Sequence, residues 1–229
     1  MPGRHIVKTY IKNGIYHIYN RGVEKRNIFL NAQDYHVFLQ YLKEALSNPK
    51  SIPINKTIFT LKGGTFKGIR KLPKNFYSNI TLLAYCLMPN HFHLLIQQTN
   101  ERDIKLFMQS IITRYSMYFN KNHNRVGGLF QNHYKASLVM EEPYLLHLSR
   151  YIHLNPTTYT KDIIGAYSSY ADYLGNRHTQ WIHAEFILSY FQNNKLLYLK
   201  NINTYKDFVE SYRDNDDERL GSLTLEETS

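Results

Sequence analysis

The sequence has one cysteine and no long apolar run. Because Cys86 is alone, no disulfide can form within the chain, which is typical of a reducing compartment. The longest unbroken apolar run covers residues 82–88, far short of the roughly 18 residues that cross a membrane. The opening residues, MPGRHIVKTYIKNG, include no apolar stretch of signal-peptide length. We therefore expect a cytoplasmic protein without a membrane span.

Acidic residues are missing from a long central stretch. Between Glu44 and Glu101 there is none, whereas seven lysines and arginines lie there. Residues 205–229 hold 8 of the 18 acidic residues and 3 of the 28 lysines and arginines. The rest of the chain therefore carries 25 bases against 10 acids. Such a field attracts polyanions, nucleic acid first. A solvated basic face without a partner is the alternative. The 20 tyrosines and 12 phenylalanines favour nucleic acid, because unstacked bases pack against aromatic rings.

What is present suffices for a folded core. Apolar residues make up 43% of the 229 residues, which predicts one domain with an appended piece. Apolar periodicity and turn residues mark the elements. We expect strands at 15–21, 80–88, 91–98 and within 127–140, and helices at 31–46, 102–120, 144–154, 184–192 and 205–213. The order β-α-β-β-α-β predicts an α+β, ferredoxin-like (RRM-like) antiparallel sheet with helices on one face.

Two additions extend this pattern. Residues 47–79 are rich in lysine, glycine and proline and predict a long basic insertion with a hairpin around Gly63-Gly64. Beyond the main domain, 1–176, residues 177–229 predict a helical C-terminal extension that ends in a mobile acidic tail.

The hairpin at 80–98 carries a pair of histidines. On a strand, His91 and His93 point to one face while Phe92 points to the core. Two neutral imidazoles on one face can share a divalent cation. Alone, a His-x-His pattern is more often exposed or structural than a ligand pair, so a third partner is needed. His17 and His133 can line the sheet nearby, with a structural role as the default.

The helix after Pro143 suggests that partner. Tyr151 and Asn155, four residues apart, share one helical face, so a phenol oxygen and an amide oxygen can approach one point. Asn155 would complete a His/His/Asn metal site with Tyr151 beside the substrate. The alternative is that both residues only pack and cap the helix end. Nitrogen and oxygen ligands suit Mn²⁺ and permit Mg²⁺, and a closed structural zinc site is less favoured.

In combination these motifs resemble a known family. The segments CLMPNHFHLLI (86–96), GGLFQNHYKASLV (127–139), RYIHLNP (150–156) and YSSYADYLG (167–175) are similar to the single-tyrosine HUH transposases, and most similar to the REP-associated tyrosine transposases. The likeness runs from about residue 16 to 175. It implies metal ligands at His91 and His93, a nucleophile at Tyr151 and a third ligand at Asn155. Some family members have Gln at this last position. The long insertion and the C-terminal extension depart from a minimal member.

The resemblance also implies an activity. It implies a metal-dependent endonuclease and strand-transferase on single-stranded or hairpin DNA, acting through a 5′-phosphotyrosine and a free 3′-OH, in a monomer or homodimer. No nucleotide cofactor is expected, because the sequence has no phosphate-binding loop motif. From charge alone, the expected DNA contacts are Lys62, Lys67, Arg70, Lys71, Lys74, Lys121, Arg125 and Lys135.

Two other functions remain open at this stage. A catalytically inactive nucleic-acid-binding or regulatory protein could keep the fold, although pure binding needs no complete His/His/Tyr/Asn set. An RRM-like RNA-binding protein would present aromatics on its two central strands, where this chain presents His91 and His93.

Overall fold

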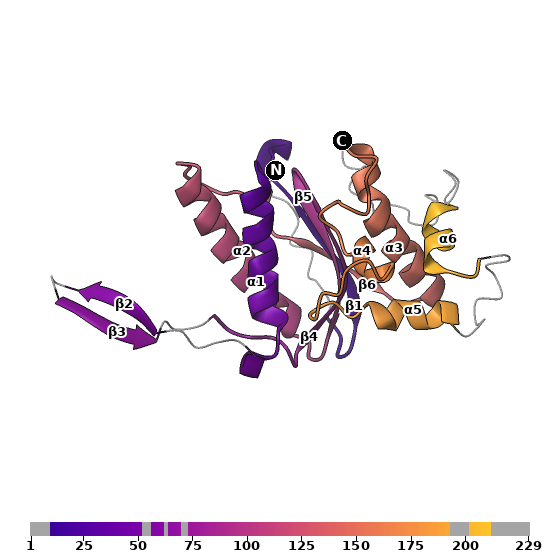
Figure 1. Ribbon diagram of the computed structural model, residues 1–229, viewed down its shortest axis with the longest axis horizontal. Coiled ribbons are helices and arrows are strands. Elements are labelled where there is room, and N and C mark those ends of the chain that lie inside the picture. The colour runs from indigo at the N-terminus through magenta and orange to yellow at the C-terminus, as the bar shows by residue number, and fades with distance from the viewer. Residues whose placement is uncertain (1–9, 52–55, 62–63, 70–72, 193–201, 212–229) are drawn as a thin grey trace.

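The computed structural model describes residues 10–51, 56–61, 64–69, 73–192 and 202–211. They form a four-stranded antiparallel sheet, a separate two-stranded hairpin and a set of helices (Figure 1). The strands are β1 (Ile15–Arg21), β2 (Lys56–Leu61), β3 (Gly64–Ile69), β4 (Ile80–Met88), β5 (His91–Gln98) and β6 (Lys135–Val139). The α-helices are α1 (Ala32–Leu46), α2 (Asp103–Asn122), α3 (Glu142–Leu154), α4 (Tyr170–Tyr173), α5 (Ala184–Gln192) and α6 (Tyr205–Glu210).

The main sheet has the order β4-β5-β1-β6. Its strands and the helices α1 and α2 follow each other as β1-α1-β4-β5-α2-β6, with β1 and β5 in the centre. Both central strands are almost entirely buried. This arrangement confirms the predicted α+β, ferredoxin-like fold.

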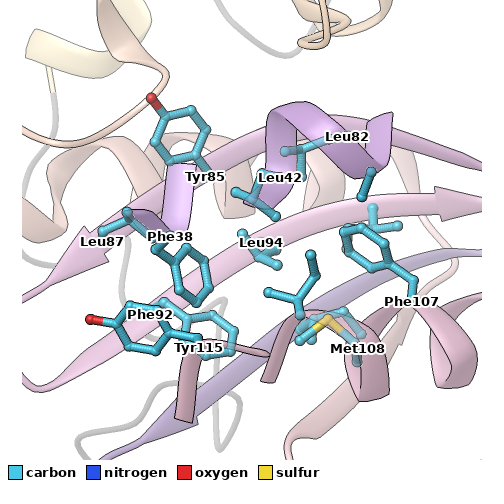
Figure 2. Close-up of a cluster of buried hydrophobic side chains, with 14 of the residues drawn as sticks. Phe38, Leu42, Leu82, Tyr85, Leu87, Phe92, Leu94, Phe107, Met108 and Tyr115 are labelled. Carbon is cyan, nitrogen blue, oxygen red and sulfur yellow. The ribbon is translucent and has the colours of Figure 1, made fainter. Parts of the chain in front are cut away.

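One face of the sheet packs against α1 and α2. Figure 2 shows this core, where Phe38 and Leu42 of α1 meet Phe92 and Leu94 of β5 and Phe107 of α2. All five side chains are fully buried. Because side chains alternate along a strand, Phe92 points to the face covered by α1 and α2, as expected.

The opposite face of the sheet is also covered by helices. There α3 packs over β4 and β5, α5 packs against β4, and α6 lies against α3 (Figure 1). Leu95, Leu146, Ile187 and Phe208 are fully buried in this second cluster. The expectation of helices on one face is corrected by this layer. The physical reason is visible in β5, where Leu94, Leu95 and Ile96 are consecutive apolar residues, a pattern of strands buried on both faces.

Local signals agree with most element boundaries. Asn31 caps α1, its side chain accepting a hydrogen bond from the Asp34 backbone N–H, and Pro143 lies in the first turn of α3. The strand expected within 127–140 is shorter, because only Lys135–Val139 pairs continuously with β1. The expected acidic tail lies outside the described residues.

The basic insertion contains the expected hairpin. β2 and β3 pair in antiparallel register from Lys56 opposite Ile69 to Leu61 opposite Gly64. Figure 1 shows the two strands standing apart from the main sheet and its helices. Among the described helices, none is both long enough and apolar enough to cross a membrane.

Candidate active site

The two histidines of β5 lie on the α3 face of the sheet. His93 is fully buried and His91 is 9% exposed. β1 runs antiparallel beside them, with Tyr19 opposite His93 and Arg21 opposite His91. His91 and His93 therefore point to the same face of a central strand, as the His-x-His pattern predicted.

The helix α3 places Tyr151 and Asn155 over these histidines. The ring centroids of His93 and Tyr151 are 5.5 Å apart, with the rings nearly perpendicular. His91 Nε2 lies 3.5 Å from Asn155 Oδ1. The structure therefore brings together all four side chains that the sequence predicted.

The amide of Asn155 has a defined orientation. Its Nδ2 donates to the backbone carbonyl of Tyr151 at 2.9 Å, a carbonyl at the helix end that also accepts the backbone N–H of Asn155. Its Oδ1 is consequently the atom that faces His91. Asn155 thus caps the helix and also presents an oxygen, so the two interpretations left open by the sequence are compatible.

The tautomer of His91 follows from its neighbour Asn90. Nδ1 of His91 lies 2.6 Å from Asn90 Oδ1, while Asn90 Nδ2 donates to the carbonyl of Lys25. Since an amide oxygen only accepts, Nδ1 carries the proton and Nε2 has the lone pair. Two lone pairs, on His91 Nε2 and Asn155 Oδ1, therefore face each other with no proton between them.

His93 presents a third candidate ligand atom. Its Nδ1 is 2.8 Å from His17 Nε2, and its Nε2 is buried without a hydrogen-bond partner among the described residues. Burial and, to a smaller extent, the positive charge of Arg21 lower the pKa of His91 to about 4, although the contact with Asn155 acts in the opposite direction. Burial, His91, His17 and Arg21 all lower the pKa of His93 well below its usual value. Both rings are therefore neutral near pH 7 and can act as ligands.

These donors fit a divalent cation. In the described part of the chain, no group of three or more His, Cys, Asp or Glu side chains is arranged to hold a metal, so a site here depends on the amide oxygen of Asn155. Two imidazole nitrogens and one amide oxygen leave positions open for substrate oxygen and water.

Seven of the eight predicted basic contacts separate into three groups. Lys62, Arg70 and Lys71 lie outside the described residues. Lys67, Lys74 and Lys121 lie on the hairpin, before β4 and at the end of α2, respectively. Lys135 lies beside the site, with its Nζ 5.6 Å from the centre of the Tyr19 ring.

Arg125 has a different environment from the one that charge alone suggested. Its guanidinium donates to the carbonyl of Gly127 at 3.3 Å and to that of Gly128 at 2.6 Å. It also donates to the side chain of Asn120 at 3.0 Å. These bonds hold the loop after α2, so several of its donors are already used within the protein.

Sequence reasoning did not single out Arg21. It lies at the end of β1, opposite His91 in register, and its charge lowers the pKa of both His91 and His93. The signal was available: His17, Tyr19 and Arg21 alternate along 15–21 and so share one strand face. What was missing was the knowledge that this strand pairs with β5.

The segment that carries the site matches a protein family. Residues 67–155 match the family model described as "Transposase IS200 like". The resemblance to these transposases is confirmed. The matched segment runs from β3 to the end of α3 and contains His91, His93, Tyr151 and Asn155.

A similar fold is also found among solved structures. One is titled "Structure of the REP associates tyrosine transposase bound to a REP hairpin"; it superposes with a TM-score of 0.51 at 12% sequence identity. The match covers 79% of this chain and 98% of that chain. At this identity the likeness shows a shared fold. A search of curated proteins found no match.

Proposed function

We propose that the protein is a metal-dependent single-strand DNA endonuclease and strand-transferase in which Tyr151 is the nucleophile. The convergence of Tyr151 with three candidate ligand atoms, His91 Nε2, His93 Nε2 and Asn155 Oδ1, carries the proposal. The family match over residues 67–155 supports it. A hairpin DNA substrate is favoured because the structural relative is described as bound to a REP hairpin and this chain has a net charge of +10.

Each residue has a definite part in the proposed reaction. His91, His93 and Asn155 would hold Mg²⁺ or Mn²⁺, which when bound would withdraw charge from the scissile phosphate and orient it. The Tyr151 oxygen attacks phosphorus, the bond to the 3′-oxygen breaks, and a 5′-phosphotyrosine forms. The proton lost by the phenol is balanced by the one that the leaving 3′-oxygen takes up. Because one phosphodiester bond replaces another, a 3′-OH can reverse the step on a second strand without ATP.

The positive charges around the site fit this chemistry. A phenol is mostly protonated at neutral pH, so nearby positive charge favours its nucleophilic form. Arg21 at the end of β1 and Lys135 at the start of β6 flank Tyr19 on the face that α3 covers. We expect both side chains to contact backbone phosphates.

A covalent adduct tests the proposal. Wild-type protein incubated with end-labelled hairpin DNA and Mn²⁺ should give a labelled band at the size of a protein–DNA adduct on a denaturing gel. Tyr151→Phe lacks the attacking oxygen and should give no adduct, and EDTA should abolish the adduct of the wild type. Tyr144→Phe, the same change on the same helix, is the matched control and should keep the adduct.

The opposite results are equally informative. An adduct that survives Tyr151→Phe would rule out this nucleophile. Hairpin binding in a gel-shift assay, combined with no adduct on any hairpin tried, would favour the alternative of a DNA-binding protein that does not cut.

A further inference from the structure

His17 lies directly behind the metal-site histidine His93. It is on β1, fully buried, and its Cα pairs with Leu95, so it sits diagonally across from His93 on the same sheet face. The two rings are stacked with centroids 5.1 Å apart and planes 15° apart. His17 Nε2 and His93 Nδ1 are 2.8 Å apart, so one of them donates a proton to the other.

The direction of this hydrogen bond decides what His93 can do. If His93 Nδ1 donates, the lone pair of His93 is on Nε2, the atom that has no partner among the described residues. If His17 Nε2 donates, His93 Nε2 carries a proton and cannot bind a cation. A ligating histidine generally donates its other ring N–H to an acceptor, and His17 Nε2 is positioned as that acceptor.

The rest of the His17 ring agrees with a role beyond packing. With Nε2 as acceptor, the proton of neutral His17 is on Nδ1, which is buried and has no partner among the described residues. Leaving a buried N–H unpaired costs free energy, so an aliphatic side chain would fill the same space at lower cost. Burial lowers the pKa of His17 to about 3, consistent with a neutral ring.

We propose that His17 is a positioning residue for the cation site: its Nε2 accepts the Nδ1 proton of His93 and so holds the lone pair of His93 Nε2 toward the cation. The inference rests on the proposed function, since it assumes that His91, His93 and Asn155 bind a divalent cation. It adds a residue from β1 to a site otherwise built from β5 and α3.

Calorimetric titration of the full-length protein with Mn²⁺ alone tests this role. His17→Leu removes the acceptor at similar volume and should raise the Kd for Mn²⁺ by about 10–100-fold, whereas His17→Gln, whose side-chain oxygen can still accept, should stay within about threefold. Cys86→Ala is the matched control. Cys86 is fully buried and lies opposite His93 on β4, so this change alters packing beside His93 without removing the hydrogen bond.

Two further measurements separate positioning from misfolding. Thermal unfolding without metal should show cooperative transitions for all three variants, and their affinity for hairpin DNA in EDTA should equal that of the wild type. A Kd for Mn²⁺ in His17→Leu equal to the wild-type value would overturn the inference and leave the proposed function standing. Equal losses in His17→Leu and Cys86→Ala would overturn it in favour of packing. If the wild type itself binds no Mn²⁺, the proposed metal site fails, and the inference with it.

Discussion

Buried imidazoles distinguish the α3 side of this protein at the scale of single residues. His17, His93 and His153 are fully buried and His91 is nearly so. His153 is held by Tyr205 through Nδ1 and by Ser169 through Nε2, both at 2.7 Å. Its two nitrogens are thus satisfied inside the protein, whereas His93 keeps Nε2 unpartnered among the described residues. This difference separates a structural histidine from a candidate ligand.

Acid should destabilise the folded protein through these histidines. Burial lowers the pKa of His17 and His153 to about 3 and that of His91 to about 4, against about 6.5 in an unfolded chain. At pH values between the folded and unfolded pKa, the unfolded chain binds more protons than the folded chain. The contribution of these histidines to stability is therefore full above about pH 6.5. It falls with decreasing pH by up to about 1.4 kcal/mol per pH unit for each histidine.

Urea unfolding at a series of pH values, with EDTA present, measures this slope. His153→Gln removes one titrating group and should give a shallower slope than the wild type between about pH 6 and pH 4.5. A free energy of unfolding that does not change over this range would contradict the assignment of these rings as buried and neutral.

At the scale of elements, α6 and α3 are joined by a buried polar cluster. The Tyr205 hydroxyl of α6 contacts His153 Nδ1 at 2.7 Å and donates to Ser149 Oγ at 3.0 Å. Arg150 of α3 donates to the carbonyl of Phe208 and lies over its ring. The C-terminal extension therefore packs against α3, the helix that also carries Tyr151.

Tyr205→Phe should weaken this junction. It removes one hydroxyl and leaves buried polar atoms with fewer partners, which should lower the free energy of unfolding by about 1–3 kcal/mol. Chemical denaturation measures the change. Tyr190→Phe on α5 is a matched control, because the Tyr190 hydroxyl makes no hydrogen bond that the described structure shows; equal effects of the two changes would contradict the assigned cluster.

At the scale of the whole molecule, the β2–β3 hairpin forms a basic arm that stands apart from the main sheet. The β2–β3 hairpin pairs with no other described strand, and Ile58, Phe66 and Lys67 on it are exposed. A lone two-stranded hairpin is marginally stable in water, and this one lies in a stretch without an acidic residue between Glu44 and Glu101. These features favour an arm that binds DNA phosphates beyond the proposed catalytic site.

Lys67→Ala should weaken binding of hairpin DNA and make it less sensitive to salt. Losing one phosphate contact should reduce the slope of log K against log salt concentration by about 0.7–0.9. Fluorescence anisotropy at several salt concentrations measures both quantities. The exposed Lys43 on α1 is the control; a slope that falls equally in Lys43→Ala would show that only net charge matters.

Much of this protein could be predicted from local pattern. Alternation in 91–98 placed His91 and His93 on one face and Phe92 on the other, and helical spacing paired Tyr151 with Asn155. Both predictions depend on residues close in sequence. The short strand in place of 127–140 and the second helical layer were not predicted, because each depends on which distant segments pair or pack.

The sequence by itself determined most of the elements, their order and the identity of the four side chains proposed for catalysis, since periodicity and motif spacing are properties of neighbouring residues. The tertiary structure alone decided that β1 lies beside β5, which sets His17 behind His93 and Arg21 opposite His91. It also decided the proton positions: the contacts of Asn90 and Asn155 turn lone pairs of His91 and Asn155 toward each other. Such directions depend on strand order and helix placement, which no local pattern contains.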